Sequence, residues 1–187
     1  TNLKKFFTAS SETDKLAMKT MAMGGHRMRP LLAVLAYESY CEKVGEDVQE
    51  TLAVIIECFH KASLVHDDIE DNEDFRYDQP ALHRREGIPT AINVGDYLIG
   101  KGYGLLADIP CDAGTRGACM KIVSASHLTL SEGQGADILF AKHIGQRSVG
   151  EVLEIFKQKT GEAVKVALLM GAVMAKAPEN ELRHLSR

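Results

Sequence analysis

Several features that would restrict the fold are scarce or missing in this sequence of 187 residues. Its five prolines leave several long segments uninterrupted. The four cysteines lack the CxxC spacing of zinc or redox sites, so we expect a reduced, cytoplasmic protein. The longest strongly apolar run, residues 167–175, is far shorter than the roughly 20 residues of a membrane span. With no apolar N-terminal stretch before a cleavage site, we expect neither a signal peptide nor a transmembrane segment.

An excess of basic charge is missing as well. The formal net charge is −4, whereas a nucleic-acid-binding protein usually carries a basic face, so we expect no nucleic acid as a partner. Apolar residues make up 45% and charged residues 26%, which is ordinary for a soluble globular chain. The length is enough for one domain with a sizeable core.

The alternation of apolar and polar residues that indicates strands is absent, and helical periodicity dominates. Between residues 50 and 68, apolar residues such as Leu52, Ile55 and Phe59 recur at steps of three and four, and Cys58 reads as part of the core. Similar patterns predict helices over residues 31–41, 88–106, 117–130 and 149–177. The sequence therefore predicts an all-α domain with helices longer than the average of about 11–12 residues.

An acidic segment follows the first of these patterns directly, with seven carboxylates between Asp67 and Asp78. On a helix, Asp67 and Asp71, and likewise Asp68 and Asp71, project from one face. Like charges so close together destabilise the fold unless a cation neutralises them, and oxygen ligands suit Mg²⁺. Mg²⁺ keeps several waters and is often completed by substrate phosphates, so few protein ligands suffice.

Other interpretations of the acidic segment are a solvated helix end and a helical metal-dependent phosphohydrolase built on His66 and Asp67. An EF-hand is excluded because the alternating aspartates and the central glycine are missing. His60 lies seven residues before Asp67 on the same side of the helix, roughly 10 Å away. Ala62 and Ser63, one turn below the aspartates, leave room for an apolar group.

Basic residues surround this segment in the sequence. Gly24 and Gly25 precede Arg29, and such a turn lets backbone and guanidinium approach a phosphate closely. Arg76 follows Asp71 closely enough to reach a ligand shared with a metal, whereas we expect Arg84 and Arg85 to face water.

Polar residues also lie on two apolar helix faces. Lys159 is in line with the apolar residues Ile155 and Ala163, so its ammonium either reaches the helix edge or points into a cavity towards a phosphate. Gln134 and Asp137 could likewise point inward, although polar side chains on core faces are more often simply hydrogen-bonded than catalytic.

These elements occur in one characteristic order: GGxRxRP, HxxSLxHDDxxD, R-(x)3-P-(x)2-H, INxGDYL, SEGQxxD and KT. In this order, from Gly24 to about Ala177, the chain resembles the trans-polyprenyl diphosphate synthases of the isoprenoid synthase family. The resemblance implies a helical bundle around a central apolar cavity, usually as a homodimer. It also implies that a metal-bound allylic diphosphate departs to leave a carbocation, which the double bond of isopentenyl diphosphate attacks.

The resemblance also implies roles for individual residues. Asp67, Asp68 and Asp71 would bind Mg²⁺, which holds the allylic diphosphate. Arg76, Lys159 and Thr160 would bind that diphosphate too, with Gln134 and Asp137 lining the site. Arg29 and His60, with His26 at a position where the family usually has lysine, would bind isopentenyl diphosphate. Ala62 and Ser63 stand where bulky aromatic residues give short products, so we expect a product of C20 or longer.

The chain departs from the family pattern in three places. His26 replaces a lysine and Tyr77 replaces the second of two arginines, and both changes concern the isopentenyl diphosphate site. We also expect residues 1–187 to form a single polyprenyl synthetase-like domain lacking the C-terminal part with the second aspartate-rich motif. Alternatives to elongation are therefore a family member that ionises an allylic diphosphate without elongating it, or a non-catalytic subunit of a heteromeric synthase.

Overall fold

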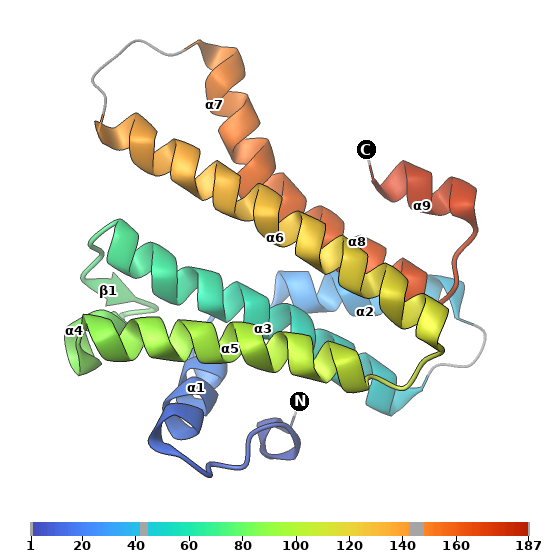
Figure 1. The fold of residues 1–187 in the computed structure, drawn as a ribbon, viewed down its shortest axis with the longest axis horizontal. Coiled ribbons are helices and arrows are strands. Elements are labelled where there is room, and N and C mark those ends of the chain that lie inside the picture. The colour runs from blue at the N-terminus through green and yellow to red at the C-terminus, as the bar shows by residue number, and fades with distance from the viewer. Residues whose placement is uncertain (1, 42–44, 143–147, 187) are drawn as a thin grey trace.

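The computed structural model describes residues 2–41, 45–142 and 148–186 as a bundle of helices (Figure 1). In chain order the elements are η1 (Leu3–Lys5), α1 (Glu12–Ala22), α2 (Met28–Tyr40), α3 (Glu46–Glu70), β1 (Phe75–Arg76), β2 (Gln79–Pro80), α4 (Leu82–Glu86), α5 (Ile88–Asp108), α6 (Ala113–Lys142), α7 (Val149–Phe156), the π-helical segment η2 (Lys157–Gly161), α8 (Glu162–Met174) and α9 (Glu179–Leu185).

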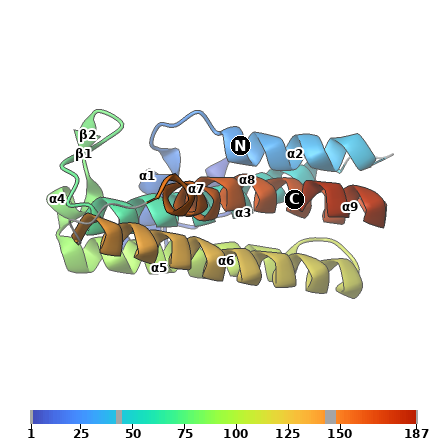
Figure 2. The same cartoon turned by 90° about the horizontal axis from the view of Figure 1, so that it is seen from above.

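The long helices run nearly along one direction and form layers, as the view from above shows (Figure 2). Helix α3 packs along α5, α2 packs along α8, and α6 packs against α8 and η2. The β1–β2 hairpin and α4 lie at the end where α3 finishes and α5 begins (Figure 1). This end of the bundle is where the acidic segment lies.

Helix α3 is the central element because it supplies both halves of the core. Its Leu52 and Ile55 are fully buried in one group of apolar side chains with Leu106, from α5, and Met170, from α8. Val54, Cys58, Ala62 and Val65, on another side of α3, are buried in a second group with parts of α1 and α5. Burial of apolar area on two sides of one helix, at roughly 25 cal/mol per Å², holds the bundle around it.

Glycines allow the closest helix contacts. An added methyl at Gly95 or Gly102 of α5 would collide with His66 or Phe59 of α3, respectively, so these glycines let the two helices meet. The INxGDYL sequence therefore contributes close packing against α3. Gly133 likewise allows α6 to approach η2 closely, since a methyl added at Gly133 would lie 2.7 Å from Cβ of Gln158.

The predicted all-α class is confirmed, and the structure adds detail to the predicted helices. Helix α6 extends twelve residues past Leu130, to Lys142, although its apolar residues show only a weak helical periodicity. The helix predicted over 149–177 is divided into α7 and α8 by the π-helical turn η2. Helices α1, α4 and α9 and the short hairpin were not predicted. In the three described stretches, none of the helices has the length and apolarity needed to cross a lipid bilayer.

Candidate active site

A cavity of about 400 Å³ lies between α3, α5, α6 and the α8 side of the bundle. Its walls are mainly apolar and come from four helices. These wall residues are Ile56, Phe59, Ala62, Leu64, Ile99, Val123, Leu130, Ile138, Ala163 and Val166. A volume in this range suits an extended small molecule, and few polar groups suffice to orient it.

Eight of the residues predicted from the sequence line this cavity together. They are Arg29, His60, Ala62, Ser63, Asp67, Gln134, Lys159 and Thr160. The other predicted residues lie around it: Asp71 is exposed, Asp68 and Arg76 line a neighbouring small cavity, Asp137 contacts Lys159, and His26 is exposed outside both cavity linings. The structure therefore places these charged and polar groups around one mainly apolar cavity.

Asp67 is the aspartate of the aspartate-rich segment that lines the cavity, where the neighbouring Glu70 lies as well. Its partial burial raises its pKa to about 6; Lys159 opposes this rise, and the neighbouring carboxylates of Glu70 and Asp71 add to it. Asp71 follows α3 as its C-terminal cap, and its N–H donates to the carbonyl of Asp67 at 2.8 Å. The unfavourable charge density at this position would be relieved by a cation.

Asp68 points to a different partner. It is buried, and its Oδ1 accepts hydrogen bonds from Nε of Arg76 at 2.8 Å and from Nη2 of the same residue. Both bonds use one oxygen, so Oδ2 is the atom with which Asp68 would reach a metal. The pair also fixes the β1 strand, which carries Arg76, against the end of α3.

The carboxylate oxygens of Asp67 and Asp71 suit Mg²⁺, a hard cation. Within the described residues no three His, Cys, Asp or Glu side chains converge into a complete metal site. Mg²⁺ binds readily through one or two carboxylates together with waters and substrate phosphates, so this donor set fits a metal that arrives with a diphosphate.

Lys159 lies across the cavity from α3 and is half-buried. Its Nζ forms an ion pair with Asp137 of α6 at 2.5 Å. The residue is part of η2, whose backbone comes close to Gly133, so the SEGQ segment positions Lys159 against α6. π-helical turns recur at functional sites, and here the turn sets the direction of the lysine.

Gln134 links α6 to the acidic end of α3. Its Nε2 donates to Oε2 of Glu70 at 2.8 Å, while its buried Oε1 has no hydrogen-bond partner in the described structure. An unpaired buried acceptor is costly, and a ligand donor or water at the cavity would satisfy it.

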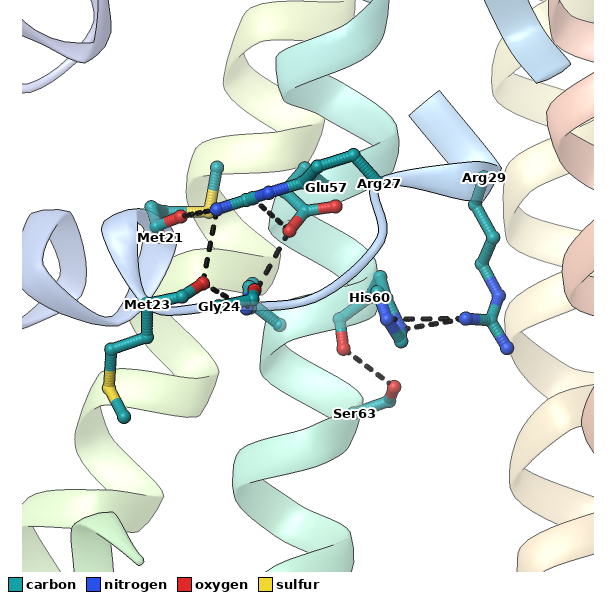
Figure 3. Close-up of polar contacts among 9 residues, drawn as sticks. Met21, Met23, Gly24, Arg27, Arg29, Glu57, His60 and Ser63 are labelled. Carbon is teal, nitrogen blue, oxygen red and sulfur yellow. Dashed lines mark hydrogen bonds and ion pairs between the residues drawn. The ribbon is translucent and has the colours of Figure 1, made fainter. Parts of the chain in front are cut away.

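Arg29 faces His60 at another side of the cavity (Figure 3). Nη1 of Arg29 lies 3.2 Å from Nε2 of His60 and 3.4 Å from its Nδ1. Burial, and then nearby cations with Arg29 first, together lower the pKa of His60 to about 3, so the imidazole is neutral at pH 7. Nε of Arg29 is buried without a hydrogen-bond partner, so this N–H of the guanidinium group can still donate to an anion.

Arg27 of the same basic segment points elsewhere (Figure 3). Its guanidinium pairs with the buried carboxylate of Glu57 and donates to the carbonyls of Met21 and Met23 at 2.7 and 3.1 Å. The left-handed backbone of Arg27, with φ of 53°, turns the chain into α2. Arg27 therefore holds the segment in place, so that Arg29, rather than Arg27, faces the cavity.

An aromatic group in the cavity region was missed by the sequence reasoning. The rings of Phe59 and Tyr103 meet edge to face at 5.0 Å, and the hydroxyl of Tyr103 lies 3.1 Å from Nδ1 of His127. Phe59 and His127 line the cavity. The spacing of Phe59 from Ala62 and Ser63 on the same helix could have indicated its place, but nothing local connects it to His127.

Comparisons with known proteins identify the architecture. The family model for polyprenyl synthetase matches residues 11–187. The chain is 32% identical over 181 residues to the short chain isoprenyl diphosphate synthase of Methanocaldococcus jannaschii, covering 96% of this chain and 53% of that protein.

Solved structures agree with the sequence comparison. A crystal structure of geranylgeranyl pyrophosphate synthase has a TM-score of 0.90 and 31% identity, covering 98% of this chain and 55% of that one. The geranyltransferase from Helicobacter pylori, complexed with magnesium and isoprenyl diphosphate, has a TM-score of 0.83 and 26% identity, with 95% and 61% covered. The chain thus spans about half the length of the curated relative it matches. The resemblance seen in the motifs is confirmed, and the chain belongs to the polyprenyl synthetase family.

Proposed function

We propose that this chain carries the active centre of a Mg²⁺-dependent prenyltransferase, which condenses an allylic prenyl diphosphate with isopentenyl diphosphate. The observation that carries this proposal is the apolar cavity of about 400 Å³ that joins Asp67, Lys159 and Arg29 in one lining. A prenyl diphosphate has the same two parts, a hydrocarbon chain and a highly charged head. The relatives named as isoprenyl and geranylgeranyl diphosphate synthases support the assignment.

Different residues of the site would bind the metal, bind the diphosphate and exclude water. Asp67 and Asp71, with Oδ2 of Asp68, would hold Mg²⁺, which when bound neutralises charge on the leaving diphosphate. Lys159 and Thr160 would bind that diphosphate directly, and Arg76 would add charge beside it. The apolar walls exclude water, which protects the allylic cation from hydrolysis once the C–O bond breaks.

A second diphosphate would bind on the Arg29 side. The neutral imidazole of His60 supports the guanidinium, and a flat fork of donors matches phosphate oxygens. The new C–C bond forms when the double bond of isopentenyl diphosphate attacks the allylic cation and a proton is then lost. His26 is exposed near this segment and would reach an anion from solvent.

One observation supports the alternative that the protein ionises an allylic diphosphate without elongating it. The ring of Tyr77 lies directly against Gly24 and Gly25, where the second diphosphate is expected. A protein in which this position stayed closed would ionise an allylic diphosphate without adding a unit. A non-catalytic subunit is the third possibility, and it would lack turnover by itself.

One assay separates these possibilities. We expect the full-length protein with Mg²⁺, farnesyl diphosphate and radiolabelled isopentenyl diphosphate to form a longer labelled prenyl diphosphate. Farnesol or a hydrocarbon without label would favour the non-elongating alternative. No turnover alone, with a changed product length after mixing with an active synthase, would favour the subunit. An unchanged substrate under all these conditions would contradict the proposed function.

Product length is proposed to be C20 or more because small residues stand at the cavity wall. Ser63→Phe would place a ring into the lining, and we expect the main product to become shorter by at least one five-carbon unit. Chromatography of the dephosphorylated products measures this, with Ser124→Phe as the control, since Ser124 is exposed on α6 outside the cavity lining. Equal product lengths for the two variants would show that Ser63 does not limit the chain.

We also propose a homodimer, as the family resemblance implies. Exposed apolar side chains on α5 and α6, namely Ile88, Ile92 and Leu128, are the kind of surface that such an interface buries. Light scattering that gives the mass of a single chain at micromolar concentration would contradict this.

A further inference from the structure

A second, much smaller cavity lies beneath the β1–β2 hairpin. Its volume of about 20 Å³ is enough for a single water molecule. Three cationic residues, Lys61, Arg76 and Arg85, line it together with one carboxylate, that of Asp68. The lining is therefore positively charged overall, which favours an anion.

Lys61 is the unusual member of this lining because only 1% of its surface is exposed. Its Nζ donates to the carbonyls of Met23 and Gly24 at 2.7 and 2.8 Å. It lies 3.8 Å from Glu57, whose carboxylate also pairs with Arg27. Two of three ammonium donors are thus used by carbonyls, and the nearest carboxylate is shared with a second cation.

The remaining side of the Lys61 ammonium faces an aromatic ring. Its Nζ lies 4.4 Å from the centroid of the Tyr77 ring, in a cation–π contact. Burial lowers the pKa of Lys61 to about 8; Glu57 opposes this, whereas Arg27 and Arg76 add to it. The ammonium is therefore under-compensated where it lies, and an anion in place of the ring would stabilise it better.

Tyr77 lines the small cavity, and its ring covers the Lys61 ammonium on one side. It lies in the tight hairpin turn, where Tyr77 and Asp78 have φ angles of 53° and 61°, a strained region for residues with side chains. Its ring packs on the two glycines, since a methyl at Gly24 would lie 2.9 Å from its Cγ and one at Gly25 2.9 Å from its hydroxyl. The cover over the Lys61 ammonium thus depends on one ring at a two-residue turn.

We propose that Lys61, with Arg76 and Arg85, forms a diphosphate-binding site that the ring of Tyr77 covers, and that a diphosphate displaces the ring to reach the Lys61 ammonium. The ligand assignment rests on the proposed function, which supplies prenyl diphosphates as substrates. The same chemistry would accept the head group of isopentenyl diphosphate or released inorganic diphosphate. Lys61 would then supply the positive charge that is missing because Tyr77 stands in place of the family's second arginine.

Titration calorimetry with inorganic diphosphate, in EDTA so that no metal contributes, tests the site. We expect Lys61→Met to bind at least tenfold more weakly than the unaltered protein. Lys101→Met is the matched control, because Lys101 also lies over an aromatic ring, 5.2 Å from the centroid of Phe7, outside both cavity linings. Equal affinity for Lys61→Met and Lys101→Met would overturn the proposal.

Tyr77→Ala supplies a second test that does not remove a buried charge. Taking away the cover should make inorganic diphosphate bind severalfold more tightly, and unchanged or weaker binding would overturn the proposed displacement. In protein with ¹³C-labelled tyrosine, the Tyr77 resonance, assigned with Tyr77→Phe, should shift when diphosphate is added. A resonance that stays in place while diphosphate binds would place the anion elsewhere.

Two further titrations identify the source of the ligand and keep this proposal separate from the proposed function. If isopentenyl diphosphate competes with inorganic diphosphate and loses affinity in Lys61→Met, the site serves the substrate; if only inorganic diphosphate does so, it serves the product. Both results support the site. Mg²⁺-dependent binding of an allylic diphosphate should be unchanged in Lys61→Met. If the unaltered protein showed no Mg²⁺-dependent binding of an allylic diphosphate, the proposed function would be refuted, whereas the proposed anion site would not be affected.

Discussion

Asp67→Ala is expected to abolish Mg²⁺-dependent binding of an allylic diphosphate, with an affinity loss on the order of 100-fold or more. Loss of residues that only support metal ligands already costs about 10–100-fold, and Asp67 is the aspartate of its segment that lines the cavity. The measurement is calorimetric titration of farnesyl diphosphate with and without Mg²⁺.

The matched control is Asp108→Ala, which removes an exposed carboxylate at the end of α5, outside the cavity lining. It should bind like the unaltered protein. Without Mg²⁺, Asp67→Ala should bind no more weakly than the unaltered protein, because it removes a negative charge from the neighbourhood of the diphosphate. Metal-dependent affinity that survives in Asp67→Ala would exclude this carboxylate as a ligand.

Gly171→Ala is expected to give the largest loss of stability. Its added methyl would lie 2.1 Å from the carbonyl oxygen of Ala33 and 2.8 Å from the backbone nitrogen of Tyr37, both in α2. Backbone atoms cannot rotate away as a side chain could, so α2 and α8 must separate. We expect the free energy of unfolding to fall by about 3 kcal/mol, the upper end of the range for overpacked cores. Urea denaturation followed by circular dichroism measures it.

Gly104→Ala is the control for this substitution. Gly104 is also a helical glycine, in α5, but no heavy atom lies within 4 Å of an added methyl. Because alanine favours a helix over glycine by up to about 1 kcal/mol, this variant should be as stable as the unaltered protein or slightly more stable. If both variants behaved alike, the α2–α8 contact would be looser than described. The contact also matters for the site, since α2 carries Arg29 and α8 directly follows η2, which carries Lys159.

Sequence periodicity was sufficient to predict the longer helices, though not α1, α4 and α9, and it was sufficient for one face of α3. His60, Ser63 and Asp67 repeat at intervals of three and four residues, so their common direction into the cavity follows from helical geometry alone. Family resemblance placed Lys159 and Gln134 opposite them. The three α3 residues were predictable because a regular helix fixes the direction of every side chain once one is known.

What sequence reasoning could not give depends on contacts between distant segments. Adjacent helix residues point about 100° apart. Asp68 therefore points in a different direction from Asp67, and its Oδ1 contacts Arg76, a partner that the hairpin supplies. Lys61 reads as an ordinary charged residue within its helix, and only the return of the Met23–Gly24 segment buries it. The packing of Tyr77 on Gly24 and Gly25, which lie more than fifty residues earlier in the chain, has no local signal.

The π-helical turn η2 has a geometric consequence for the chain on both sides of it. A π turn accommodates an additional residue relative to an α turn, so α7 and α8 are out of phase by about 100° although they share one continuous helical path. The apolar stripe that ends in the exposed Leu153 and Phe156 of α7 consequently does not continue into the buried stripe of α8. The continuous helix thus has two apolar faces with different orientations. The face on α8 is buried inside the bundle, and the face on α7 is exposed.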